Sequence, residues 1–363
     1  MSKRCSLKIS LGLVFLSAVL FGGGYGIYRW LKANPAIITE RYRPFSRGVL
    51  RGLASVSAVV PFSLAEILVY LAVLGGIALI VRVVWVLVTG DRPRVKFLIR
   101  VISVLLLIAV CALVGYYGLW GMNYFGMTLG SELGLDVQKR SSAELAELSR
   151  YLVQETNRLA VLVDRNEDGS FAEKYTFEYF AKATSREFSE YSGAPEPEPK
   201  YVIASEGLSH FRTTGIFVCY TGEANVNADN YVSSLPFCMA HEIAHRYAVA
   251  REDEANFMSF LVLHDAEDPA LQYSVWLAAL RYTQAQLRSA DMDAYLAVAA
   301  EYSDLVNYDN AKYSEYWSQF EGKAAEVSQK TNNAYLSANG QTDGVKSYGR
   351  MVDLLLAWYA AKD

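Results

Sequence analysis

Residues 235–246 read Leu-Pro-Phe-Cys-Met-Ala-His-Glu-Ile-Ala-His-Arg, and residues 251–257 read Arg-Glu-Asp-Glu-Ala-Asn-Phe. Both segments place apolar residues at helical spacing, which predicts two buried helices. Only four residues separate the segments, and none of them is glycine. The chain must therefore reverse sharply between the two helices, and this helix pair decides how the C-terminal part folds.

The first segment contains the motif His241-Glu242-Ile243-Ala244-His245. On a helix, positions i and i+4 lie on one face about one turn apart, so His241 and His245 can converge on a single Zn²⁺ ion. Glu242 lies between them and can take a proton from a water molecule that the metal activates. The motif predicts a zinc site with Glu242 as general base.

A catalytic zinc site needs a third protein ligand and keeps one position for water. No glycine and third histidine follow His245 at the metzincin spacing. Glu252 is followed four residues later by Asn256, so Glu252 can bind the metal while Asn256, which does not bind the metal itself, forms a hydrogen bond that orients one of the ligands. Glu254 is the alternative third ligand; it points about 160° away from Glu252 on a helix, so both do not bind the same ion.

The first third of the chain has a different composition. Residues 1–120 contain 14 Lys and Arg against 3 Asp and Glu, whereas residues 121–363 contain 20 against 35. Overall, 52% of residues are hydrophobic and 20% are charged, which excludes a disordered or nucleic-acid-coating chain. We expect a basic membrane domain over residues 1–130, a soluble acidic domain over residues 131–363, and no nucleic-acid partner.

Three apolar stretches predict transmembrane helices at about residues 9–28, 64–88 and 100–121. Each is long enough to cross about 30 Å of hydrocarbon at 1.5 Å per residue. A cleaved signal peptide is the alternative for the first stretch, although that stretch is long and has no Ala-x-Ala site. The lipid bilayer is therefore an expected partner of this protein.

The orientation in the membrane is not decided by the flanking charges, because Lys and Arg residues divide equally between the two sides. The short, dense basic segment 82–100 favours an N-terminus inside the cell, which puts residues 134–363 outside the cytoplasmic membrane. Cys219 and Cys238 belong to this part and could pair there or stay reduced.

From about residue 134 onwards the pattern is that of amphipathic helices, with Ser141 and Glu144 as a capping box and a second helix over 171–191. Residues 192–200 contain three prolines and cannot continue a helix. Short β-like runs follow at 201–204, 215–220 and 223–227. The predicted fold class is mainly α: three N-terminal transmembrane helices, then a mostly helical α+β domain with a small sheet.

A His-Glu-x-x-His helix followed by a separate Glu-bearing helix resembles the Glu-zincin branch of the zincin metallopeptidases. The basic three-span front, the segment Thr221-Gly222-Glu223-Ala224-Asn225-Val226-Asn227 and the short distance to Glu252 resemble more narrowly a bacterial membrane family catalogued as domain of unknown function 3810. This resemblance covers nearly the whole chain. It implies presumed zinc-dependent hydrolysis at the bacterial cytoplasmic membrane, with no established substrate.

The zincin resemblance also implies that peptide binds along an edge strand preceding the metal helix, a role that residues 216–220 or 223–227 could fill. Arg246 departs from the zincin pattern, in which an uncharged residue usually follows the second histidine. Tyr348 and Arg350, on the last predicted helix, are candidates for a donor to the oxyanion.

Two functions from different classes follow from these residues. The first is a membrane-anchored zinc peptidase that acts on a peptide or protein substrate. The second is a membrane-anchored binding or sensor module with a structural or vestigial metal site. Alternatively, the two histidines are ordinary core residues and the acidic run is a first-turn charge cluster.

Overall fold

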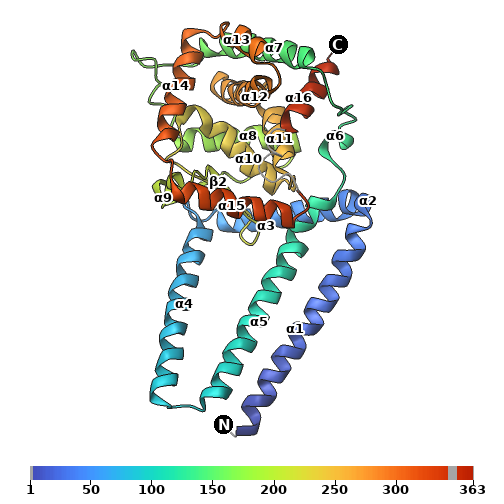
Figure 1. The fold of residues 1–363 in the computed structure, drawn as a ribbon, viewed down its shortest axis with the longest axis vertical. Coiled ribbons are helices and arrows are strands. Elements are labelled where there is room, and N and C mark those ends of the chain that lie inside the picture. Colours follow the sequence, from blue (N-terminus) through green and yellow to red (C-terminus); the bar gives the residue numbers. More distant parts are fainter. Residues whose placement is uncertain (1–2, 342–349, 363) are drawn as a thin grey trace.

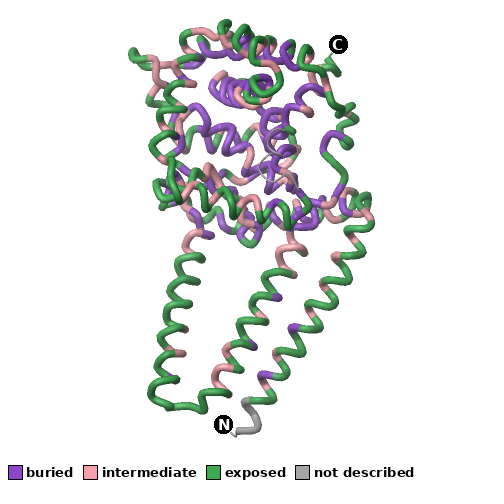
Figure 2. The backbone as a smooth tube through the Cα atoms, viewed as in Figure 1, coloured by how far each residue is buried: buried purple, intermediate pink, exposed green. Residues whose placement is uncertain are grey.

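A body made largely of helices carries three long helices on one side, as Figure 1 shows for the computed structural model, which describes residues 3–341 and 350–362. The long helices are α1 (Lys3–Lys32), α4 (Leu64–Thr89) and α5 (Arg94–Leu119). All three are long and apolar enough to cross a membrane. Their surfaces are mostly exposed, in contrast to the body (Figure 2). The predicted fold class, mainly α with three N-terminal membrane helices and a small sheet, is confirmed.

Short elements connect the long helices to the body on the side that we call its base. They are α2 (Pro35–Ile37), the π-helix η1 (Ile38–Tyr42) and α3 (Arg43–Ser57) after α1, and the 3₁₀-helix η2 (Gly121–Phe125) and α6 (Leu129–Glu132) after α5. Helix α3 lies along the base (Figure 1). It buries Arg43, Ser46, Leu50, Ala54 and Ser57, which recur at helical spacing and therefore form one face.

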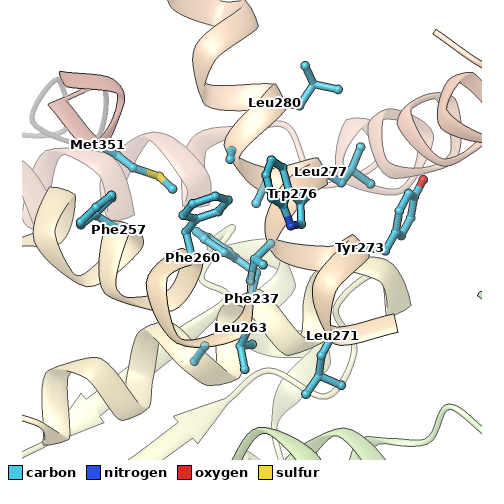
Figure 3. Packing of buried hydrophobic residues seen from close by; sticks show 14 of the residues in the cluster. Phe237, Phe257, Phe260, Leu263, Leu271, Tyr273, Trp276, Leu277, Leu280 and Met351 are labelled. Atoms are coloured by element: carbon cyan, nitrogen blue, oxygen red, sulfur yellow. The ribbon is translucent and has the colours of Figure 1, made fainter. Parts of the chain in front are cut away.

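The remaining helices of the body are α7 (Ser142–Ala160), α8 (Phe177–Ser192), α9 (Ser205–His210), η3 (Val232–Ser234), α10 (Leu235–Arg246), α11 (Glu252–Leu263), α12 (Pro269–Ala290), α13 (Met292–Ala299), α14 (Asp304–Ser318), α15 (Lys323–Ala338) and α16 (Met351–Ala360). Helix α12 packs against α7, α10, α11 and α16, so it forms the centre of the core. Figure 3 shows the packed side chains Phe237, Phe257, Phe260, Leu263, Leu271, Tyr273, Trp276, Leu277, Leu280 and Met351. This packing holds the two helices of the predicted metal site in fixed positions.

The sheet has three short strands, β1 (Lys200–Tyr201), β2 (Gly215–Val218) and β3 (Glu223–Val226), in the order β1-β3-β2. Strand β1 is parallel to β3, and β2 is antiparallel to it. Because β3 is central and completely buried, residues 223–227 cannot receive a peptide by strand addition, and that prediction is wrong. Strand β2 is at the edge and remains available.

The helix predicted over residues 171–191 begins later, at Phe177. Phe171 instead forms an isolated β-bridge with Arg165, and Thr176 caps the helix by accepting a hydrogen bond from the Tyr179 N–H. The capping box of Ser141 and Glu144 is present as predicted. Cys219 and Cys238 are both buried free thiols, so they do not pair in this structure.

Candidate metal centre

Helix α10 presents the two histidines of the motif on one face. His241 and His245 are one turn apart, and their ring centroids are 4.5 Å apart. The helix forms in an almost completely buried environment, with Met239, Ala240 and Ile243 fully buried around the pair. The motif is thus part of the packed core and not of a solvated helix face.

The chain reverses after α10 through a Schellman turn. The Val249 N–H donates to the Ala244 carbonyl and the Ala248 N–H donates to the His245 carbonyl, both at 3.0 Å. Ala248 takes the left-handed conformation, with φ 68°, that glycine usually supplies. This conformation costs an alanine about 1–2 kcal/mol, and it brings α11 back beside α10 within five residues.

Glu252, the first residue of α11, completes the cluster. Its Oε2 lies 3.2 Å from His241 Nε2 and 3.6 Å from His245 Nε2. Zinc bonds of about 2.0–2.1 Å in a tetrahedral arrangement place ligand atoms about 3.3–3.5 Å apart. The two distances to Glu252 are close to this value, and all three donor atoms lie within 4.8 Å of one another. Among residues 3–341 and 350–362, these three side chains are the group of His, Cys, Asp and Glu close enough to hold a metal.

Both imidazoles are held by hydrogen bonds on the nitrogen that faces away from Glu252. His241 Nδ1 donates to Asn256 Oδ1 at 2.8 Å, and His245 Nδ1 donates to the Val249 carbonyl at 2.8 Å. A proton on Nδ1 leaves the lone pair on Nε2, which is the atom that faces Glu252. The structure thus places Asn256 where the sequence predicts it, one turn beyond Glu252 and behind His241.

The charges in the site favour a cation. Burial opposes ionisation of Glu252, but the charges and hydrogen bonds of His245 and His241 outweigh it and hold the Glu252 pKa well below its usual range. Burial alone would lower the pKa of His245, yet Glu252 and then Glu242 raise it to about 9. Large opposite shifts on buried groups in mutual contact mark a candidate functional site.

Glu242 lies between α10 and the edge strand β2. Its side chain is 4% exposed, and its Oε2 is buried without a hydrogen-bond partner among the described residues. Burial raises the pKa of Glu242, which suits a proton acceptor. A Cβ atom on Gly215 of β2 would lie 2.5 Å from Glu242 Oε1, so this glycine leaves the space that the carboxylate occupies.

The other predicted site residues lie apart from the cluster or outside the described residues. Glu254 Oε1 accepts hydrogen bonds from the Leu129 N–H at 3.0 Å and from Arg251 at 2.9 Å, so the alternative third ligand instead ties α11 to α6. Arg350 places its Nε 3.5 Å from a carboxylate oxygen of Asp253, the residue after Glu252. Tyr348 lies outside the described residues.

Arg246, which departs from the zincin pattern, has a structural explanation. Its side chain is 1% exposed, and its Nε lies 2.5 Å from Glu196 Oε1. The other oxygen of Glu196 pairs with Arg51 of α3 at 2.9 Å. Arg246 therefore fastens the proline-rich segment 192–200 to α10, and two arginines share the charge of one buried carboxylate.

Aromatic residues that the sequence motifs did not indicate line the site. Trp120 donates its indole N–H to the His245 carbonyl at 2.9 Å, and its ring meets the His245 ring edge-to-face at 5.7 Å. Phe217 of β2 packs against both rings. Trp120 directly follows the third apolar helix, so its position indicates an interfacial aromatic residue, and no local pattern connects it with His245.

Comparison with known proteins identifies the family. The chain belongs to the family described as "Protein of unknown function (DUF3810)", which matches residues 42–356. The match includes α4, α5 and every residue of the His241–His245–Glu252 cluster. No curated protein and no solved structure matches the chain. The family description carries no activity, so it supports the narrower resemblance and not the resemblance to zincin peptidases.

Proposed function

We propose that this protein is a membrane-anchored zinc-dependent hydrolase and that it acts on peptide bonds. The observation that carries the proposal is the spacing of His241 Nε2, His245 Nε2 and Glu252 Oε2 at 3.2 and 3.6 Å, the separation that zinc ligands require. Glu242, with an unpartnered buried oxygen, lies on the same helix directly beside the first histidine.

In this proposal His241, His245 and Glu252 would hold one Zn²⁺ ion. When bound, zinc polarises a carbonyl group and lowers the pKa of water towards neutrality. Glu242 accepts the proton from the attacking water and delivers it to the leaving amine, and its raised pKa matches both steps. Asn256 and the Val249 carbonyl keep the two imidazoles in the tautomer and orientation that the reaction needs.

The second candidate function is a binding or sensor module with a structural metal. Structural zinc sites are closed by four protein ligands, whereas catalytic sites have three and keep one position for water or substrate. The described residues supply three ligands to the cluster, which favours a catalytic site over a structural one.

Metal analysis of the purified full-length chain tests the proposal. We expect about one zinc per chain in the wild type and in Glu242→Gln, loss of zinc in His241→Ala, and hydrolysis of peptides by the wild type but not by Glu242→Gln. His210→Ala is the matched control, because His210 is exposed and lies outside the cluster. A wild-type protein without a stoichiometric divalent metal, or a fully active Glu242→Gln, would refute the peptidase proposal.

We also propose that the body lies outside the bacterial cytoplasmic membrane, with the N-terminus of α1 inside the cell. Segment 192–200 offers a labelling position, since Glu198 is exposed whereas Glu196 and Lys200 are buried. In a cysteine-free background, Glu198→Cys should react with an impermeant thiol reagent in intact cells. Labelling only after lysis would establish the opposite orientation.

A further inference from the structure

The candidate site is fastened to the end of the third apolar helix. Leu50 of α3, Trp120 and Tyr124 after α5, Cys219 after β2 and Ala250 after α10 form a separate hydrophobic cluster. This cluster joins α3 and the segment after α5 to the residues that follow β2 and α10, which border the site. Trp120 is the first residue after α5 and contacts His245, so the site lies next to the end of that helix.

Polar contacts strengthen this attachment. Arg47 of α3 donates to the Tyr247 carbonyl at 3.1 Å, at the end of α10. Arg251, the N-cap residue of α11, donates to the carbonyls of Tyr124 at 3.0 Å and Gly126 at 2.8 Å. Both sides of the turn between α10 and α11 are thus bound, one to α3 and the other to the segment that follows α5. The distance between the site and the membrane helices is therefore fixed by the fold.

The edge strand β2 runs from the site towards the apolar helices. Gly215 lies against Glu242, and Phe217 packs on His245 and Trp120. Beyond the strand, the Tyr220 hydroxyl donates to the carbonyl of Ala112 at 2.6 Å. Ala112 lies seven residues before the end of α5, which corresponds to about 10 Å along the helix at 1.5 Å per residue.

The turn after β2 is also packed against α3. A Cβ on Gly222 would lie 2.2 Å from the Leu50 carbonyl oxygen, so only glycine permits this approach. In Figure 1 a loop of this region projects below the base between α4 and α5. The hairpin therefore reaches to the depth of the last turns of the third apolar helix.

The base of the body is suited to a lipid surface. The exposed positions of α3 are all uncharged, whereas its three arginines are buried or half-buried: the exposed residues are Pro44, Phe45, Gly48, Gly52, Ser55 and Val56. The ends of the long helices that adjoin the base carry aromatic residues typical of a membrane interface: Tyr25, Tyr28, Trp30, Tyr70, Tyr116 and Tyr117. These surfaces place the bilayer boundary at the base, directly beneath the candidate site.

We infer that the substrate is a polypeptide anchored in the same bilayer and cut close to the point where it leaves the membrane. This inference rests on the proposed peptidase function. A peptide added to the free edge of β2 follows the strand from Glu242 down to the level of Ala112, so one of its ends enters the lipid. Gly215, which lies against Glu242, and Tyr220, which contacts α5, are five residues apart, so the cut lies within about six residues of the membrane boundary.

The test uses the full-length protein reconstituted in liposomes of phosphatidylethanolamine and phosphatidylglycerol. One reporter carries a single apolar 20-residue helix followed by a randomised 12-residue segment and a soluble tag. The matched reporter carries the same segment and tag without the helix. A third reporter has a five-residue spacer between the helix and the segment. Cut positions and rates are read by mass spectrometry, with Glu242→Gln as the inactive control.

We expect the tethered reporter to be cut at least about tenfold faster than the untethered one at equal concentration. The cut should stay within about six residues of the helix in both tethered reporters. Counted from the soluble tag, it should therefore move five positions towards the helix when the spacer is added. Equal rates for both reporters, or cuts that follow the sequence and ignore the spacer, would overturn the inference and leave the peptidase function intact. No cleavage of either reporter by the zinc-loaded wild type would refute the peptidase function, and the inference with it.

Discussion

The hydrogen bond between Asn256 and His241 gives a prediction whose size can be worked out from the structure. Asn256 is 1% exposed, and its Oδ1 accepts from His241 Nδ1 at 2.8 Å, while its Nδ2 donates to the Tyr282 hydroxyl at 3.4 Å. Asn256→Ala leaves the His241 N–H buried without a partner, at a cost of about 1–3 kcal/mol. It also frees the imidazole to rotate or to take the other tautomer.

We therefore expect Asn256→Ala to weaken zinc binding by about 10- to 100-fold, which corresponds to about 1.4–2.7 kcal/mol. Asn256→Asp keeps the acceptor and should restore binding. The assay is competition for zinc against a chromogenic chelator, with the full-length chain in detergent. Ser259→Ala, one turn further along α11, is the control, because Ser259 is also buried and its hydroxyl donates to the Ala255 carbonyl, away from His241. If Asn256→Ala binds zinc within twofold of wild type while remaining folded, the orienting role assigned to Asn256 is wrong.

Glu252→Gln should lose stoichiometric zinc and Glu254→Gln should keep it, measured by metal analysis; the reverse result would show that the wrong carboxylate has been chosen. Arg246→Met leaves the buried Glu196 with Arg51 as its remaining charged partner and should destabilise the chain by about 1–3 kcal/mol in denaturant unfolding, and wild-type stability would contradict the structural role given to this arginine. Burial raises the pKa of Cys219 to about 11 and of Cys238 to about 12, so neither thiol should react with iodoacetamide at pH 8 until the protein unfolds, and fast labelling of either of these two residues in the native chain, located by peptide mapping, would contradict their burial.

The cluster of ligand atoms could be predicted from the sequence because its geometry is local. Helical periodicity alone puts His241 and His245 on one face, and it separates Glu252 from Glu254 by about 160° on the next helix. The structure brings the first three together and leaves Glu254 elsewhere. All of these residues lie within 14 positions of one another, so the face of each helix that carries them can be read from the sequence.

The turn between the two helices and the role of Arg246 could not be predicted in the same way. A Schellman turn is normally indicated by glycine, and here Ala248 occupies the left-handed position because the surrounding packing fixes it. Arg246 is paired with Glu196, 50 residues earlier, in a segment that reads as a proline-rich linker. Its charge therefore indicates an exposed or inhibitory residue until the partner is known.

The position of the site relative to the apolar helices is the feature that local sequence patterns predict least. Composition identifies the apolar helices, but the contacts of Trp120 with His245 and of Tyr220 with Ala112 span 125 and 108 residues. These contacts make the front of the chain part of the site and not only its anchor. A fragment that lacks residues 1–120 would lose Leu50 and Trp120, expose Cys219 and Ala250, and lose the indole N–H that donates to the His245 carbonyl. Such a fragment should hold zinc more weakly than the full chain, and zinc binding equal to that of the full chain would show that the attachment does not shape the site.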